Sequence, residues 1–225
     1  MKKWLRNTVM GLGIAAAGVV GGGYVTKGYR DYKIPEVIQT KNEGDIRINI
    51  YRHKENLFYE PIARLAGEYN RDSYVVKVGN SFWMLNVDTT IFEENAQAIY
   101  EDWEKYKLNA LLPKGDPNWD PRKQAAYNVL KDFKESEIKS KYLELCIEAT
   151  IAHEKTHIID SGRNLSDLES ETSAFSSELK EHPITLDILE GLKKRRKNGV
   201  HKQAAGDILK KLYGDDPWTF YHKGS

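Results

Sequence analysis

Residues 151–160 read IAHEKTHIID, and in this stretch His153 and His157 stand four positions apart with Glu154 directly after the first histidine. On an α-helix, residues four apart lie on one face, with their Cβ atoms about 6 Å apart. Two imidazoles at that spacing can bind a single zinc ion. A carboxylate beside the first imidazole can reach a water in the open coordination position. The stretch therefore predicts a helix on which His153 and His157 are zinc ligands and Glu154 is the catalytic general base.

The residues around the motif predict that its helix crosses the interior of a domain. One stripe at three–four spacing contains both histidines and a second stripe is aliphatic, while charged residues fall on the remaining side. The first stripe consists of Tyr142, Cys146, Ala149, His153, His157 and Asp160, and the second consists of Leu143, Ile147, Ile151 and Ile158. We expect the lone Cys146 to be a buried hydrophobic residue, and a single cysteine excludes an intramolecular disulfide. The alternative is a fortuitous motif whose histidines are satisfied within the core.

A third ligand is expected on the next helix. The capping box Ser166-x-x-Glu169 predicts where that helix begins. That box gives Glu169 a structural role. Glu171 instead shares its helical face with apolar residues such as Phe175, so the pattern directs its carboxylate towards the core. A buried carboxylate is costly unless a cation compensates it, and zinc would do so. We therefore predict Glu171 as the third ligand; the alternatives are Glu169, Glu178 and His182.

The segments IAHEKTH and ESETSAF together resemble the zincin metallopeptidases of the gluzincin type, over about residues 149–179. The resemblance implies Zn²⁺ held by His153, His157 and a glutamate on the following helix. It also implies hydrolysis of peptide bonds by a zinc-activated water, with Glu154 as general base. The larger gluzincins place an aspartate one turn after the glutamate ligand to orient a histidine, but this chain has Phe175 there. Asp160 is a candidate for that role; an ordinary carboxylate at a helix end is the alternative.

Residues 1–30 predict a membrane anchor or signal segment. Lys2, Lys3 and Arg6 precede an uncharged run over 8–25, which spans about 27 Å as a helix and is marginally long enough for a bilayer core. The short basic N-terminus predicts a single-pass membrane protein with its domain outside the cytoplasm. Secretion after cleavage near Ala15-Ala16-Ala17 is the alternative.

The rest of the chain predicts a linker over 31–44 and a zincin-like catalytic domain over 45–225. Ile46, Ile48 and Ile50 alternate in a strand over 45–51, and Gly79-Asn80 joins two strands, 73–78 and 81–87, in a hairpin. We expect helices over 61–69 and 90–111, the second opened by a capping box at Thr90. The fold class is therefore α+β, with a small N-terminal sheet and hairpin before a mainly helical zincin-like region. Strand 82–87 is the candidate edge that pairs with an extended peptide; an ordinary sheet strand is the alternative.

The expected partners are a peptide or protein substrate and, through the N-terminal segment, a membrane. Since 34 Lys and Arg residues balance 33 Asp and Glu residues, nothing indicates a nucleic-acid partner, and the oligomeric state stays open. A catalytic site of this kind also needs a group that stabilises the oxyanion, for which the candidates are His182, His201 and Tyr213. Two other functions fit the same sequence. One is a zinc hydrolase of another amide bond, such as that of a cell-wall peptide, and the other is a non-enzymatic membrane-anchored interaction domain.

Overall fold

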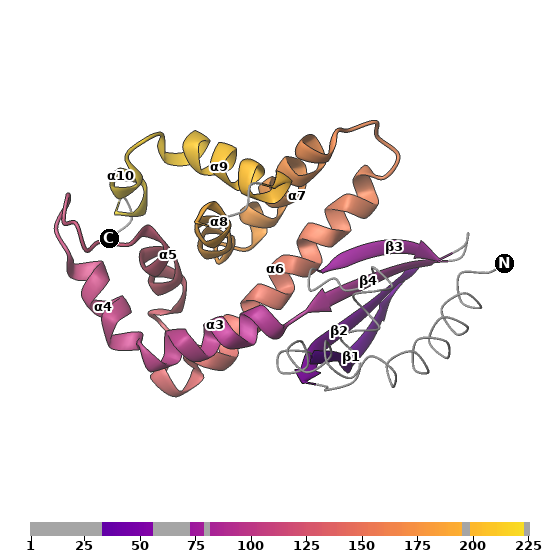
Figure 1. Cartoon of the computed structure of the whole chain (residues 1–225), viewed down its shortest axis with the longest axis horizontal. Coiled ribbons are helices and arrows are strands. Elements are labelled where there is room, and N and C mark those ends of the chain that lie inside the picture. Colours follow the sequence, from indigo (N-terminus) through magenta and orange to yellow (C-terminus); the bar gives the residue numbers. More distant parts are fainter. Residues whose placement is uncertain (1–32, 56–72, 79–81, 195–198, 223–225) are drawn as a thin grey trace, which may run out of the picture.

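The computed structural model describes residues 33–55, 73–78, 82–194 and 199–222. In this part of the chain a four-stranded sheet precedes eight α-helices, so the predicted α+β class is confirmed. Figure 1 shows the sheet at one end of the molecule and α6 running from the helical part to the sheet. The helices are α3 (Thr90–Glu101), α4 (Trp103–Leu111), α5 (Pro121–Leu130), α6 (Ile138–Asp160), α7 (Asp167–Glu181), α8 (Thr185–Lys193), α9 (Val200–Tyr213) and α10 (Pro217–Tyr221), with a short 3-10 helix η2 (Glu135–Glu137) before α6.

The sheet has the strand order β1-β2-β4-β3, in which β2 and β4 are parallel and the two outer pairs are antiparallel. Its strands are β1 (Lys33–Glu43), β2 (Ile46–Glu55), β3 (Tyr74–Val78) and β4 (Phe82–Asp88). The strand predicted over 45–51 and the β3–β4 hairpin are both present. Ile48 and Leu85, both fully buried, pack on Ile147 and Ile151 of α6. The second apolar stripe of α6 therefore packs against the sheet.

The linker predicted over 31–44 is wrong for 33–43, which form strand β1. This edge strand has solvent on both faces, since residues 37–43 are all exposed, and so its sequence lacks the alternation of a half-buried strand. The available signal was Gly44-Asp45, a two-residue hairpin turn in which Gly44 has a φ of +59°. The folded region therefore begins well before residue 45.

The edge predicted for 82–87 is also wrong, because β4 lies between β2 and β3. Parallel pairing with β2 puts β4 inside the sheet, and this pairing joins segments far apart in sequence. The outermost described strand on that side is β3.

The long helix predicted over 90–111 is two helices, α3 and α4, which separate at Asp102. Asp102 leaves helical geometry, with φ −102° and ψ 14°. The capping box predicted at Thr90 does not form: Thr89 is the N-cap, it makes no side-chain cap hydrogen bond to the helix backbone, and its hydroxyl donates to the Glu93 carboxylate.

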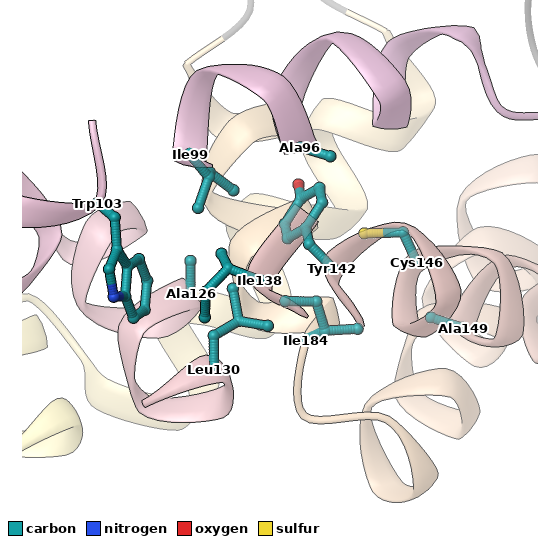
Figure 2. Close-up of a cluster of buried hydrophobic side chains, with 10 residues drawn as sticks. All are labelled: Ala96, Ile99, Trp103, Ala126, Leu130, Ile138, Tyr142, Cys146, Ala149 and Ile184. Atoms are coloured by element: carbon teal, nitrogen blue, oxygen red, sulfur yellow. The ribbon is translucent and has the colours of Figure 1, made fainter. Parts of the chain in front are cut away.

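The first stripe of α6 faces the helical core. Figure 2 shows Tyr142, Cys146 and Ala149 of α6 against side chains of α3 and α5 and the start of α8. The prediction for Cys146 is confirmed, as it is a buried free thiol whose pKa burial raises well above its usual value. The same helix thus supports the sheet on one face, packs into the core on another, and carries the two histidines near its C-terminal end.

Three predictions concern residues outside the described ranges: the anchor or signal segment over 1–30, the helix over 61–69 and the turn Gly79-Asn80. Within the described ranges, none of the helices combines the length and apolar character needed to cross a bilayer.

Candidate metal centre

The predicted site residues lie on helices α6 and α7. Helix α7 starts with the predicted capping box, in which Glu169 accepts a 2.8 Å hydrogen bond from the Ser166 backbone N–H and stays at the surface. Two residues later, Glu171 points instead towards α6. The structure therefore brings Glu171 to the histidines and leaves Glu169 in the cap.

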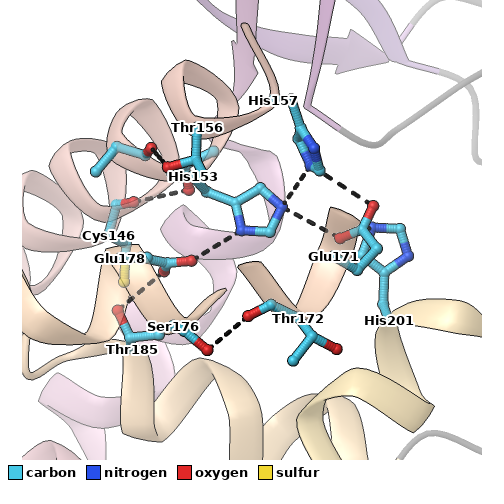
Figure 3. Close-up of polar contacts among 12 residues, drawn as sticks. Cys146, His153, Thr156, His157, Glu171, Thr172, Ser176, Glu178, Thr185 and His201 are labelled. Atoms are coloured by element: carbon cyan, nitrogen blue, oxygen red, sulfur yellow. Dashed lines mark hydrogen bonds and ion pairs between the residues drawn. The ribbon is translucent and has the colours of Figure 1, made fainter. Parts of the chain in front are cut away.

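Donor atoms of His153, His157 and Glu171 converge at one point, as Figure 3 shows. The two Nε2 atoms are 3.1 Å apart. Glu171 Oε2 is 3.3 Å from His153 Nε2, and Glu171 Oε1 is 3.6 Å from His157 Nε2. Ligand atoms placed 2.0–2.1 Å from a tetrahedral zinc ion lie about 3.3–3.4 Å from one another. The spacing of this cluster therefore fits zinc.

The other ring nitrogen of each histidine has a partner of its own. His153 Nδ1 lies 3.1 Å from Glu178 Oε2, and His157 Nδ1 lies 2.9 Å from Ser170 Oγ. A carboxylate accepts hydrogen bonds, so this contact favours a proton on His153 Nδ1, and the neutral ring with its proton there has a lone pair on Nε2 for a cation. Glu178 is 1% exposed and receives a second hydrogen bond, 3.0 Å, from the Thr185 hydroxyl on α8.

The two facing Nε2 atoms and the neighbouring Glu171 carboxylate favour a positive charge between them. With Nδ1 of both rings engaged elsewhere, two Nε2 atoms face each other beside a carboxylate. Glu171 Oε2 is buried and accepts no hydrogen bond of good geometry from the described residues. Burial lowers the pKa of His153, but contacts with Glu171 and Glu178 outweigh it and raise that pKa to about 9. Burial and the neighbouring His153 lower the pKa of His157. A divalent cation satisfies the same demand with all three donors at once.

Asp160 does not contact either histidine in the described structure. Its carboxylate accepts a 2.7 Å hydrogen bond from the Ser173 hydroxyl and pairs with Arg163 at 3.0 Å, so it ties the end of α6 to α7. These contacts support the alternative interpretation of Asp160, a structural carboxylate at a helix end. Phe175 packs on the His153 ring, with centroids 4.4 Å apart.

Glu178 is the site residue whose role the sequence reasoning missed, since it was considered only as an alternative ligand. The signal was available. Glu178 follows Glu171 by seven residues, or two helical turns, and thus lies on the same inward stripe as Phe175. A carboxylate at such a position needs a buried partner, and His153 is that partner.

Glu154 is buried on α6 and borders a cleft of about 500 Å³ that also contains the histidine–glutamate cluster. Among the three oxyanion candidates, only His201 lines this cleft. Its Nε2 is 3.3 Å from Glu171 Oε2, and its side chain is 52% exposed. His182 instead caps the end of α7, and the Tyr213 hydroxyl donates to Glu190.

Comparison of the chain with protein-family models, curated proteins and solved structures found no match. The resemblance to gluzincins thus depends on the motif and on the residues around it.

Proposed function

We propose that this protein is a zinc-dependent metallopeptidase of the gluzincin type, with His153, His157 and Glu171 as zinc ligands. The observation that carries the proposal is the convergence of these three donors while Glu178 and Ser170 engage the remaining histidine nitrogens. A His-Glu-x-x-His motif that arose by chance would not be expected to contact a carboxylate on a second helix. Nor would a hydrogen-bond partner be expected at Nδ1 of both histidines.

When bound, a zinc ion at this position acts as a Lewis acid, polarising a carbonyl and lowering the pKa of a coordinated water towards 7. We assign the proton transfers to the chain's own residues. Glu154 borders the cleft, so its carboxylate accepts the proton of the attacking water and then passes it to the leaving amine. Its burial on α6 fixes it relative to the ligand His153, which is the adjacent residue.

His201 is the residue we assign to the developing oxyanion. It lies on the first turn of α9, it contacts the ligand Glu171, and it faces the cleft. From there an imidazole N–H can donate to a carbonyl oxygen as negative charge builds up on it.

The surroundings of the cleft favour an extended peptide as substrate. Ser73 and Val75 line it; Val75 is in the outer strand β3, and Ser73 directly precedes that strand. An outer strand offers backbone donors and acceptors to a peptide lying alongside it. The predicted N-terminal anchor would hold this cleft near a membrane.

The direct test is Glu154→Gln in the purified full chain, kept in detergent because of the predicted anchor. We expect one bound zinc, measured by elemental analysis, and a loss of peptide cleavage of about 10²–10⁴-fold. Glu148→Gln, on the exposed side of the same helix, serves as the matched control and should retain both zinc and activity. Full turnover in the Glu154 variant would refute the mechanism. A zinc-loaded parent that cleaves no peptide would refute the function.

A further inference from the structure

A groove of about 780 Å³ lies between α7 and α9, two helices that pack side by side (Figure 1). Its lining residues fall within 172–180 of α7 and 207–212 of α9. None of them borders the cleft of the candidate metal centre. This space, which we call the α7–α9 groove, is therefore a separate feature of the surface.

Apolar residues of the groove come from both helices. Ile208 is 6% exposed and belongs to the buried helical cluster, and Leu179 packs against that cluster. Leu212 lies one turn after Ile208 and is 36% exposed. A partner with apolar side chains of its own would remove this surface from water, which is favourable. An apolar surface bordered by polar residues is typical of an interaction site.

Lysines border the same groove. Lys180 lies in the last turn of α7, and Lys210 and Lys211 lie in the last turn of α9. All three side chains are exposed, and within the described ranges none of them forms an ion pair or a hydrogen bond. The only acidic residue that lines the groove is Asp207. Three lysines against one aspartate give the groove a net positive charge, so a negatively charged partner complements it.

We infer that the α7–α9 groove binds an amphipathic helix with acidic flanks from another protein. Helices bind such grooves by placing apolar side chains at three–four spacing into them. Leu179, Ile208 and Leu212 would receive those side chains, and glutamates or aspartates on the flanks would pair with the three lysines. A membrane surface fits less well, since it takes protruding apolar side chains, whereas Ile208 is recessed. The inference does not depend on the proposed peptidase function.

The test uses the full chain in nanodiscs of zwitterionic lipid and a fluorescent peptide of about 18 residues, long enough to form a helix. The peptide has leucines at three–four spacing and glutamates at the flanking positions. Fluorescence anisotropy should show saturable binding. A peptide of the same composition with scattered leucines, and one with lysine in place of each glutamate, should each bind at least about 10-fold more weakly. Equal binding of the three peptides, or no binding of the first, would overturn the inference.

Charge reversal tests the lysines. Lys210→Glu together with Lys211→Glu should weaken binding of the acidic peptide at least about 10-fold, because like charges then face each other. Lys123→Glu together with Lys131→Glu, on α5, is the matched control: it makes the same change of net charge at lysines outside the groove. The control should bind the peptide as the parent does. An equal loss in both double variants would reduce the effect to net charge and refute the groove as the site.

A second pair of variants tests the apolar contact. Leu212→Gln should weaken binding at least about 5-fold, because a polar side chain would be buried where an apolar one was. Leu165→Gln is the control, since Leu165 is 37% exposed and lies outside the groove. Zinc content should match the parent in every variant, which separates loss of the groove from loss of the fold or of the metal centre. Unchanged binding in the Leu212 variant would count against an apolar docking site.

Two results would assign the groove to another occupant and so overturn the inference. One is binding of the full chain to phosphatidylglycerol vesicles that displaces the peptide and is lost on reversing Lys210 and Lys211. The other is self-association of the chain in detergent, measured by sedimentation, that the same double variant abolishes.

Discussion

Two carboxylates withdrawn from solvent, Asp187 and Glu171, have contrasting surroundings. Asp187 is 1% exposed and its oxygens are satisfied within the chain: Arg122 Nε donates to Oδ1 at 2.8 Å and the Tyr142 hydroxyl donates to Oδ2 at 2.6 Å. Glu171 faces imidazole nitrogens, and its buried Oε2 accepts no hydrogen bond of good geometry from the described residues. The first cluster is complete as a structural tie between α5, α6 and α8. We propose that a cation completes the second.

The largest expected effect comes from breaking the complete cluster. Asp187→Ala leaves the guanidinium of Arg122 without its buried partner, which should lower the free energy of unfolding by about 3–5 kcal/mol. Urea denaturation measures this loss, and zinc content of the folded fraction should stay at one per chain. Glu144→Ala, which removes the exposed pair Lys141–Glu144, should leave stability unchanged. Equal stability of the two variants would mean that the Asp187 cluster is not a structural tie.

The incomplete cluster should respond to metal instead. Zinc that binds only the folded chain stabilises it by about 3–4 kcal/mol when free zinc is 100–1,000 times its Kd. We therefore expect a chelator to lower the melting temperature of the parent and to have no effect on Glu171→Ala. If neither zinc nor chelator changed the melting temperature of the parent, this cluster, like that of Asp187, would need no cation.

A smaller effect is expected from Glu178, which acts on zinc through His153. Glu178→Gln should weaken zinc binding by about 10–100-fold in competition with a chelating dye, because the carboxylate that orients the ring and raises its basicity is lost. Glu190→Gln provides a matched control: Glu190 is also 1% exposed, but hydroxyls of Tyr213 and Tyr221 satisfy it away from the histidines. Equal zinc affinity in the two variants would remove Glu178 from the site.

The smallest effect should follow Ser170→Ala. The Ser170 hydroxyl orients His157 as Glu178 orients His153, but it is neutral, and hydrogen bonds to a charged group are about twice as strong as neutral ones. Zinc affinity should therefore fall by less than in Glu178→Gln. A larger loss in the serine variant would reverse the order of the two supports.

Features set by residues close together in the sequence could be predicted, whereas features set by contacts between distant segments could not. The convergence of His153, His157 and Glu171 could be predicted because it depends on local rules: four-residue spacing, a capping box, and an acidic residue on an apolar stripe. The zinc ion itself stays a prediction.

Features that depend on distant pairing could not be predicted in the same way. Strand β1 has no alternation to reveal it, and the position of β4 inside the sheet depends on its parallel pairing with β2. The sequence marks Glu178 as a carboxylate on an inward stripe that needs a buried partner, but identifying His153 as that partner required the α6–α7 contact. The break at Asp102 shows that a continuous apolar period does not exclude a bend.

The most direct test of the account is the zinc stoichiometry of the full chain, of Glu171→Ala and of Glu169→Ala, measured at neutral pH after removal of loosely bound metal. The two variants remove carboxylates two residues apart on one helix, of which one faces the histidines and the other caps the helix at its surface. We predict one zinc per chain in the parent and in Glu169→Ala, and a loss of tightly bound zinc in Glu171→Ala. A parent that retains no zinc, or equal retention by all three proteins, would contradict the account.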